Sequence, residues 1–336
     1  MFPSISGRCV QMVLLLTRDD VISVLQMKDC IDVLEKAFTE LANGTAVLPL
    51  RIGIKPPGGL SLYMPAFLQE MNALACKVVT VYKDNPAKHN MPTTIGKVLL
   101  QDSETGNVIS IMDGGYLTAV RTGAVSGLAT RYLAREDHGQ VAGIFGAGVQ
   151  AKMQLWGVYE ARNIVKALVF DKFPDAAQKF AEEMGKKLNI PIDIVSKNED
   201  VLVADIICTA TSSPTPIFDG DLVKDGAHIN GIGSHTPNAR ELDTSIVKRS
   251  LFIADSREGC LSEAGDIMIP IQNGELTAEH IHAELGEIIT GKKTGRTSAG
   301  RITLFKSNGL AIQDAATAKL VYDMAVKKGI GREVDI

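Results

Sequence analysis

The sequence lacks an apolar run that approaches the roughly 18 residues needed to cross a membrane. It also lacks an excess of basic residues, and its net charge of −4 leaves no electrostatic footprint for nucleic acid. The apolar segment from Met12 to Leu16 is too short for the core of a secretory signal, and Arg18 follows it closely. We therefore expect a cytosolic protein that binds neither membranes nor nucleic acid. Residues 1–11 show no clear pattern, so Met12 is an alternative start to Met1.

Signatures of disulfide frameworks and metal sites are missing as well. The five cysteines are odd in number, dispersed and free of any C-x-x-C pattern, which argues against both. The six histidines include no H-E-x-x-H pattern, and no metal is predicted. With 45% hydrophobic and 22% charged residues over 336 positions, the chain has the composition and length of two ordinary globular domains.

The first third of the chain predicts helices followed by strands. Residues 17–43 carry apolar side chains at helical spacing and predict two short helices, which Gly44 would end. Proline, glycine, asparagine and aspartate then punctuate several consecutive strands, which predicts antiparallel pairing. These strands are expected at 61–64, 75–81, 96–100 and 108–112. A helix rich in small residues is expected from Leu117 to Leu133, and its small side chains predict close packing against another element.

The pattern changes to alternating strands and helices near residue 135. Such alternation predicts an α/β fold with a parallel, doubly wound sheet of the Rossmann type. The strands are expected at 141–145, 167–171, 191–195, 203–208, 227–231 and 251–254. A final helix is expected over 308–328, again with small residues that suit tight packing.

A glycine-rich turn at residues 146–148 is the most informative local feature. The apolar run Val141–Phe145 precedes it, and a helical pattern follows from Val149 to about Tyr159. This order of strand, turn and helix presents main-chain N–H groups to a pyrophosphate. Gly146 and Gly148 would allow the tight turn and the approach of the phosphates, and a small residue follows in the helix. The alternative is an ordinary buried strand-to-helix turn.

Three further segments extend this interpretation. Asp171 ends the next apolar run 25 positions after Gly146, near the spacing of about 20 expected for a carboxylate on a ribose 2′-hydroxyl. Lys172 follows it and would offset repulsion of a 2′-phosphate. The segment Thr209–Pro214 and the glycine-rich turn Gly231–Asn238 each follow a strand, where a doubly wound sheet places its ligand.

Three cations interrupt apolar surroundings in the first third of the chain, namely Arg51, Lys77 and Arg121. Burial of an unpaired cation is costly, so each needs an anionic partner or a route to water. They could converge on the carboxylate of a ligand, or they could be snorkelling or internally paired side chains. His235 lies in the second glycine-rich turn and could move protons near neutral pH, unless it is a solvated surface residue.

Together these features resemble the ornithine cyclodeaminase/μ-crystallin family of NAD(P)-binding proteins. The resemblance covers about Leu14 to the C-terminus, in nine ordered segments. The segments are Met64-Pro65, Lys77, Asn85-Pro86, Met91–Thr93, Ala119–Ala124, Gly146–Ala151, Arg240–Asp243, Glu263–Asp266 and Thr303–Asp314.

The resemblance implies a homodimer with two domains in each chain. A substrate-binding and dimerisation domain would comprise residues 1–134 and 307–336, and the inserted Rossmann domain would comprise 135–306. Arg51, Lys77 and Arg121 would hold a substrate carboxylate beside the nicotinamide, together with Asn308. The residues expected to contact the cofactor are Thr93, Arg121, Gly146, Ala147, Gly148, Val149, Gln150, Asp171, Lys172, Thr209, Thr211, Gly231, Gly233 and Ser307.

One departure from the family pattern bears on the reaction. Cyclodeaminases of this family carry an aspartate in the turn that here contains His235, and a histidine cannot replace a permanent carboxylate opposite an ammonium group. The sequence around this turn is more similar to family members that reduce cyclic imino acids. We therefore expect NAD(P)H-dependent reduction of Δ1-pyrroline-2-carboxylate to L-proline, with NADH preferred and NADPH tolerated.

In this hypothesis Arg51 and Arg121 clamp the carboxylate, and Lys77 donates a proton to the imine nitrogen. Crowding of Lys77 by the two arginines would ease the loss of its proton, and His235 is the alternative proton shuttle. Three other functions stay open. They are an alanine dehydrogenase that aminates pyruvate, an ornithine cyclodeaminase, and a non-catalytic binding protein like μ-crystallin.

Overall fold

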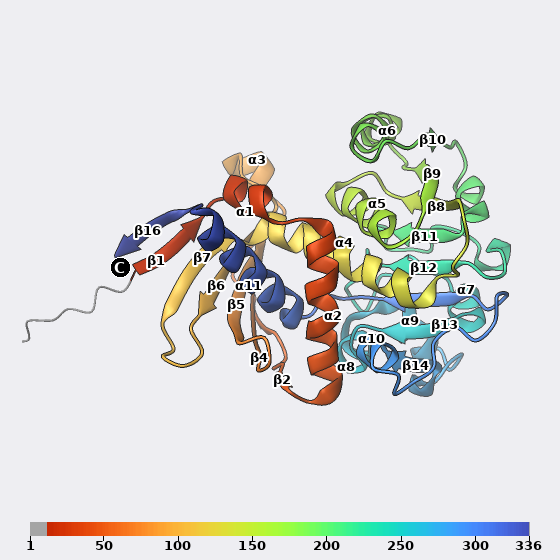
Figure 1. Cartoon of the computed structure of the whole chain (residues 1–336). Coiled ribbons are helices and arrows are strands. Elements are labelled where there is room, and N and C mark those ends of the chain that lie inside the picture. Colours follow the sequence, from red (N-terminus) through yellow and green to blue (C-terminus); the bar gives the residue numbers. More distant parts are fainter. Residues whose placement is uncertain (1–11, 336) are drawn as a thin grey trace, which may run out of the picture. The chain divides into compact units, whose positions relative to one another are not determined.

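The computed structural model describes residues 12–335 of the chain, which form two compact units (Figure 1). The first unit comprises the described residues of Met1–Gln26, Thr45–Thr118 and Ala311–Ile336. The second unit comprises Met27–Gly44 and Ala119–Leu310. The start-site alternative at residues 1–11 lies outside the described residues.

The first unit is built on one mixed sheet, in which the strands follow the order β16-β1-β7-β6-β5-β4-β2 and β3 also pairs with β4. Its elements are β1 (Met12–Leu16), α1 (Arg18–Val24), β2 (Ala46–Val47), β3 (Ile52–Ile54), β4 (Leu60–Leu68), β5 (Ala73–Val81), α3 (Asn85–His89), β6 (Thr94–Gln101), β7 (Val108–Asp113), α11 (Ala311–Lys328) and β16 (Arg332–Asp335). The predicted antiparallel pairing of the strands from β4 to β7 is confirmed.

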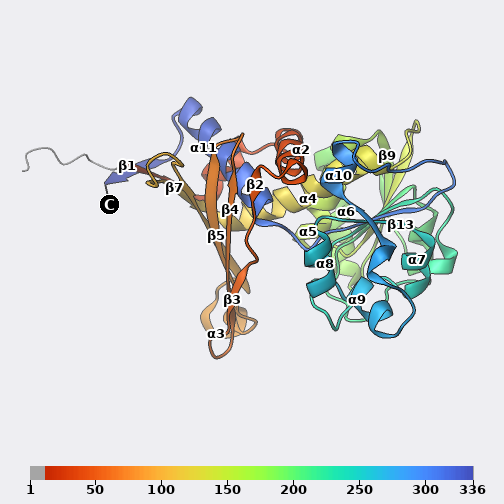
Figure 2. The ribbon, with the colours of Figure 1, turned by 90° about the horizontal axis from the view of Figure 1, so that it is seen from below.

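One face of this sheet is covered by α11, which packs along β4 and β5 (Figures 1 and 2). Alternate residues of β5, including Ala73, Ala75 and Lys77, are buried, because successive side chains of a strand point to opposite faces. Small residues of α11, such as Ala315 and Ala318, are also buried, which lets the helix approach the sheet closely. Lys77 is therefore buried on the face of the sheet that α11 covers.

The second unit is a doubly wound sheet with strand order β10-β9-β8-β11-β12-β15-β13-β14. All of its strand pairs are parallel, which confirms the predicted fold class. The strands are β8 (Gln140–Phe145), β9 (Ile164–Phe170), β10 (Ile192–Ile194), β11 (Ile206–Thr209), β12 (His228–Gly231), β13 (Leu251–Ala254), β14 (Ile281–Glu284) and β15 (Thr303–Lys306). The sheet reverses its order between β8 and β11, the position where doubly wound sheets bind ligands.

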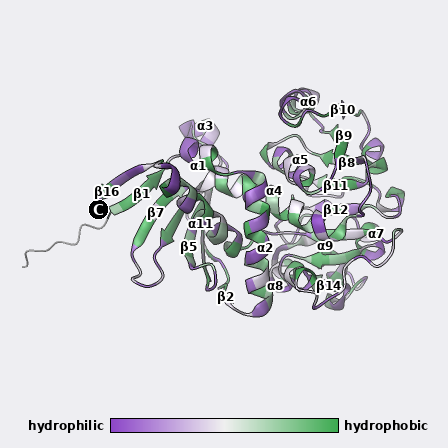
Figure 3. Cartoon of the chain, in the orientation of Figure 1, coloured by the Kyte–Doolittle hydropathy of each residue, from purple (hydrophilic) through white to green (hydrophobic). Residues whose placement is uncertain are grey.

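Helices cover both faces of this sheet (Figure 1). They are α2 (Met27–Asn43), α4 (Gly114–Leu133, which begins in the first unit), α5 (Val149–Ala161), α6 (Pro174–Leu188), α7 (Thr244–Arg249), α8 (Arg257–Glu263), α9 (Gly265–Gln272), α10 (Leu285–Ile289) and three short 3₁₀ helices. Hydrophobic and hydrophilic residues alternate along α2 (Figure 3), and its buried residues Ile31, Leu34 and Phe38 recur at helical spacing.

The small residues of α4 do allow close packing, as predicted. A Cβ atom at Gly123 would collide with the backbone of Met153 in α5, and one at Gly157 would collide with the backbone of Gly123. Residues 27–44 and 119–134 belong to the compact second unit, because α2 contacts α5 and Gly123 of α4 approaches Gly157 of α5 closely. Residues 307–310 belong to this unit as well. It is thus larger than the predicted Rossmann segment 135–306.

A buried histidine of β12 leads to a prediction about acid stability. Burial, together with the charge of Arg296, lowers the pKa of His228 to about 3, while the unfolded chain titrates near 6.5. Between these values the unfolded chain binds a proton that the folded chain does not. The free energy of unfolding should therefore fall by up to about 1.4 kcal/mol for each pH unit below about 6.5, and level off above it.

Urea unfolding at several pH values measures this effect. The His228→Asn variant cannot titrate at this position, so its free energy of unfolding should depend less steeply on pH over the same interval. Equal slopes in the two proteins would contradict the assignment to His228.

Candidate functional site

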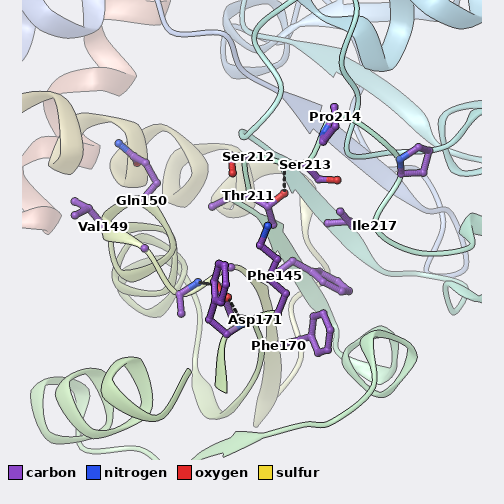
Figure 4. Close-up of a pocket in the computed structure, with 17 residues that line it drawn as sticks. Phe145, Val149, Gln150, Phe170, Asp171, Thr211, Ser212, Ser213, Pro214 and Ile217 are labelled. Atoms are coloured by element: carbon purple, nitrogen blue, oxygen red, sulfur yellow. Dashed lines mark hydrogen bonds between the residues drawn. The ribbon is translucent and has the colours of Figure 1, made fainter. Parts of the chain in front are cut away.

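A cavity of about 680 Å³ opens at the carboxyl ends of β8, β9 and β11 in the second unit (Figure 4). Its size is in the range of small-molecule sites in proteins. It lies at the reversal of strand order, so the fold and the cavity indicate the same binding region. The lining residues are Phe145, Gly146, Ala147, Gly148, Val149, Gln150, Phe170, Asp171, Lys172, Phe173, Ala210, Thr211, Ser212, Ser213, Pro214, Pro216 and Ile217.

The glycine turn after β8 forms one wall of this cavity. Gly146 has a φ of +95°, and a Cβ atom there would lie 2.7 Å from the carbonyl oxygen of Ala210, so only glycine fits without strain. Gly148 is the N-cap of α5, and no side chain caps this helix end. The first N–H groups of α5 thus remain available to an anionic ligand, as a pyrophosphate site requires.

Asp171 follows β9 and links the glycine turn to the loop after β9. Its Oδ2 accepts a hydrogen bond from the main-chain N–H of Ala147 at 2.8 Å, and its Oδ1 accepts one from Phe173 at 2.9 Å. These bonds fix the carboxylate in the cavity wall and leave one further acceptor position on each oxygen. The ammonium group of Lys172 lies 4.9 Å from the centre of the Phe173 ring.

The loops after β11 and β12 meet at the carboxylate of Glu241, which is 1% exposed. Glu241 Oε1 accepts from the N–H of Thr211 at 2.6 Å. Its Oε2 accepts from the hydroxyl of Thr209 and from the N–H of Gly233, each at 2.7 Å. Thr211 lines the cavity, whereas the hydroxyl of buried Thr209 is directed to Glu241, and buried Gly231 ends β12.

Glu241 is part of a buried charged network with Asp266 and Lys306. Asp266 Oδ1 accepts from the N–H groups of Glu241 and Leu242, at 2.8 and 2.9 Å. Lys306 Nζ lies 3.0 Å from Asp266 Oδ2 and donates to the carbonyl of Ser234 at 2.6 Å. Burial raises the pKa of Glu241, although the hydrogen bond from Thr211 and the charge of Lys306 oppose this shift. Burial alone would lower the pKa of Lys306, but the charges of Asp266 and Glu241 raise it.

A second buried carboxylate, Asp255 after β13, fixes the loop after β15. Its Oδ2 accepts from the hydroxyl of Ser307 and from the N–H groups of Asn308 and Gly309, each at 2.8 Å. Gly309 has a φ of +82°, and a Cβ atom there would lie 2.8 Å from Arg121 Nη1. This loop therefore packs against the guanidinium of Arg121.

The side-chain amide of Asn308 is left with unused hydrogen-bonding capacity. Both its oxygen and its nitrogen are buried and make no hydrogen bond within the described part of the chain. Buried polar groups normally have a partner, so an unpaired amide is a candidate contact for a bound ligand.

In the first unit, Lys77 of β5 forms an ion pair with Asp314 of α11. The two charged atoms lie 2.7 Å apart, and the side chains are 2% and 1% exposed. The sequence-based expectation that neighbouring arginines would ease the loss of the Lys77 proton did not include this carboxylate, whose charge acts in the opposite direction. A buried anion at this distance favours the charged ammonium form.

The remaining predicted residues have less enclosed positions. Arg51 is half-buried directly before β3, and Thr93 is half-buried directly before β6. His235 is exposed in the loop after β12, and its Nδ1 lies 3.0 Å from the carbonyl oxygen of Gly233. Arg51, Thr93 and Lys77 belong to the first unit, whereas Arg121 and His235 belong to the second.

Sequence reasoning missed the acids that hold these loops, namely Glu241, Asp255, Asp266 and Asp314. Three of them lie in the family segments quoted above, at 240–243, 263–266 and 303–314, but nothing in the pattern assigned them partners. Asp255 had only the signal of an acid directly after an apolar strand.

Residues 12–335 contain neither a cluster of metal-ligating side chains nor a membrane-spanning helix. No group of three or more histidine, cysteine or acidic side chains is arranged there to hold a metal ion. No helix among these residues is both long and apolar enough to span a membrane.

Comparisons with known proteins agree with this architecture. Residues 11–329 match the model of the ornithine cyclodeaminase/mu-crystallin family. A Δ1-pyrroline-2-carboxylate reductase of Bacillus cereus is 36% identical over 96% of this chain and 99% of its own length. The solved structure of the Thermococcus litoralis Δ1-pyrroline-2-carboxylate reductase with NADH and L-proline is 48% identical, covers 96% of this chain and 100% of that chain, and has a TM-score of 0.92.

An archaeal alanine dehydrogenase, solved as a dimer with bound NAD, is 34% identical with a TM-score of 0.91. This likeness covers 96% of this chain and 99% of that chain. Because the family model and these relatives span nearly the whole sequence, the chain belongs to the ornithine cyclodeaminase/mu-crystallin family.

Proposed function

We infer that this protein is an NAD(P)H-dependent oxidoreductase that reduces the C=N bond of Δ1-pyrroline-2-carboxylate to give L-proline. The single observation that carries this conclusion is the 48% identity, over 96% of the chain, to the Thermococcus litoralis reductase solved with NADH and L-proline. The cavity at the glycine turn supports it, because it offers uncapped helix N–H groups where the cofactor pyrophosphate would bind.

The substrate carboxylate is assigned to Arg51, Lys77 and Arg121. A guanidinium can bind a carboxylate through two parallel hydrogen bonds, which fixes both its position and its orientation. Asn308 is assigned to the substrate as well, because its buried amide has no hydrogen-bond partner in the described part of the chain. Ser307 and Thr93 are assigned to the cofactor.

The reaction adds a hydride to the imine carbon and a proton to the imine nitrogen, which converts C=N into CH–NH. NADH, when bound, supplies the hydride and becomes NAD⁺. Lys77 is assigned as the proton donor, and Asp314 keeps it protonated between turnovers. A proton from solvent restores the ammonium form. The exposed His235 is the alternative donor.

NADH is the preferred cofactor in this proposal. Asp171 would accept a hydrogen bond from a free ribose 2′-hydroxyl and would repel a 2′-phosphate. Its carboxylate is held by two main-chain N–H groups and cannot easily turn away. The ammonium of Lys172 lies beside the Phe173 ring and lessens the repulsion, so NADPH is also accepted.

A substrate panel tests the function directly. Pyrroline- and piperideine-carboxylate, pyruvate with ammonia, and ornithine would each be assayed with NADH and with NADPH. We expect the highest kcat/KM with Δ1-pyrroline-2-carboxylate and NADH, followed as a decrease in absorbance at about 340 nm. Faster amination of pyruvate would favour an alanine dehydrogenase, which the 34% identity to the archaeal enzyme keeps as the second candidate.

The other two alternatives give different outcomes in the same panel. A cyclodeaminase would release ammonia from ornithine without a net change in the cofactor. A non-catalytic binding protein would bind the nucleotide but turn over none of the substrates. A cytosolic location stays a prediction from the sequence.

The protein is also proposed to be a homodimer that assembles through its first unit. Apolar side chains of β3, β4 and the segment before them are exposed there, including Leu50 (64%), Ile52 (61%) and Tyr63 (36%). Clustered exposed apolar residues commonly mark a protein–protein interface. The archaeal alanine dehydrogenase that resembles this chain was solved as a dimer.

Mass measurement in solution tests the assembly. The wild-type protein should show twice the chain mass of 36.0 kDa. A variant with Ile52→Lys and Ile54→Lys should shift toward the monomer, because two charges would be buried in the contact. Val203→Lys alters an equally exposed apolar residue of the second unit (62%) and should leave the mass unchanged. A dimer that survives the double substitution would place the contact elsewhere.

A further inference from the structure

The loops after β11 and β12 are held together by one side chain that is not part of the cavity wall. Glu241 is buried and does not line the cavity, yet its carboxylate accepts three hydrogen bonds, one from the last residue of β11 and one from each of these loops. Two of the three donors, the N–H groups of Thr211 and Gly233, belong to the main chain. A change at Glu241 would therefore alter the backbone of both loops.

The loop after β11 is in direct contact with the glycine turn. Ala210 lies between the two threonines that donate to Glu241, and its N–H donates to the carbonyl of Phe145 at 3.0 Å. Its carbonyl oxygen faces Gly146 so closely that a Cβ atom there would lie 2.7 Å away. The position of the turn thus depends on a segment whose two neighbours are fixed by Glu241.

The backbone of Glu241 is itself fixed by hydrogen bonds. Asp266 accepts hydrogen bonds from the N–H groups of Glu241 and Leu242, and Lys306 neutralises Asp266. The space around its carboxylate is also restricted, since a Cβ atom at Gly233 would lie 2.5 Å from Glu241 Oε1. The carboxylate has little freedom to adapt if one of its bonds is lost.

We propose that Glu241 is a positioning residue for the nucleotide. It fixes the position of the loop after β11, which supports the glycine turn, and it does not itself contact the ligand. This inference rests on the proposed function only for the identity of the nucleotide. Replacement of Glu241 should therefore weaken the affinity for NADH and leave the rate of the chemical step almost unchanged, since Glu241 contacts no reacting atom.

The Glu241→Gln variant changes the group by a single atom type. If the amide nitrogen replaces Oε1, it faces the N–H of Thr211, and if it replaces Oε2, it faces the N–H of Gly233. Either orientation sets two donors against each other and leaves one buried N–H unsatisfied. We expect the Kd of NADH to rise about tenfold, which corresponds to about 1.4 kcal/mol of binding free energy.

A matched control lies two residues away. Asp243 also accepts two main-chain hydrogen bonds, from Gly220 at 2.8 Å and from Ile246 at 2.9 Å, but neither residue lines the cavity. Asp243→Asn should lower the melting temperature without changing the Kd of NADH. The contrast separates an effect on the nucleotide site from a general loss of stability.

The experiment measures the Kd of NADH by fluorescence for the wild type and both variants, and then KM and kcat with Δ1-pyrroline-2-carboxylate. We expect Glu241→Gln to raise the Kd and KM of NADH about tenfold while kcat at saturating NADH stays within about twofold. An unchanged Kd, or an equal rise in Asp243→Asn, would overturn the proposal. If Glu241→Gln fails to fold, Glu241→Asp keeps the charge but cannot reach all three donors, and it should also raise the Kd.

The binding measurement also distinguishes this proposal from the proposed function. If wild-type protein binds NADH but does not reduce the imino acid, the function is wrong while the Kd comparison remains valid. If the imino acid is reduced but the Kd is the same in Glu241→Gln, only the positioning role is lost.

Discussion

Replacement of Lys77 by methionine is expected to lower kcat for Δ1-pyrroline-2-carboxylate by about 10²–10⁴-fold, the usual contribution of a positioned proton donor. The Kd of NADH should stay close to that of the wild type, because Lys77 lies in the first unit and the nucleotide cavity is formed by the second. Steady-state kinetics and a direct binding assay measure the two quantities. Near-normal turnover in the variant would remove Lys77 from the mechanism and favour His235.

The partner of Lys77 makes a further variant necessary. In Lys77→Met, the carboxylate of Asp314 is left buried beside an apolar side chain, and the loss of one member of a buried ion pair commonly costs about 3–5 kcal/mol. The double variant Lys77→Met, Asp314→Asn removes that charge and should regain much of the stability. If its kcat remains as low as that of the single variant, the loss reflects chemistry; if its kcat returns to normal, the single variant was only misfolded.

The Arg121→Leu variant is expected to raise the KM of the imino acid by about 30- to 150-fold, with a smaller fall in kcat. A charge-assisted bidentate contact contributes about 2–3 kcal/mol to binding, and its loss weakens the binding of both the substrate and the transition state. Arg121 is 5% exposed, and its guanidinium packs against Gly309, so the side chain is enclosed by protein rather than solvated. An unchanged KM would exclude the carboxylate clamp.

Arg131 offers a matched control on the same helix. It is half-buried in α4 and pairs with Asp32 and Glu35 of α2, at 2.9 and 2.6 Å. Arg131→Leu removes the same charge from the same element and should affect stability but not the KM of the imino acid. A similar rise in KM for both variants would show that the effect comes from a disturbed helix.

Local signals were sufficient to predict much of the geometry of the cavity that we assign to the nucleotide. The positive φ of Gly146, the uncapped start of α5 and an acid after the next strand are properties of short segments, and each could be predicted from neighbouring residues. Four strands of the first sheet were also predicted, β5 to β7 within two residues of their observed bounds and β4 over its first half, because these strands alternate in burial and turn residues separate them. The other strands of that sheet, β1, β2, β3 and β16, were not predicted.

Long-range partners could not be predicted in this way. Strand β15 was missed, and its insertion between β12 and β13 depends on which edges are left open in the assembled sheet. The strand expected at 203–208 begins at Ile206, because residues Asn198–Val203 form a 3₁₀ helix. The pairing of Lys77 with Asp314 joins a strand to a distant helix, and no local pattern specifies such a contact.

The strand order has a consequence for how the chain is made. Strands β12 and β13 are synthesised well before β15, yet β15 lies between them and provides the hydrogen bonds to one edge of each. In the first unit, β1 is synthesised early, and its outer edge stays unpaired until β16 has been made. Both sheets therefore have unsatisfied edges until β15 and β16 have been translated, and chaperones that shield exposed strand edges would protect the nascent chain during that interval.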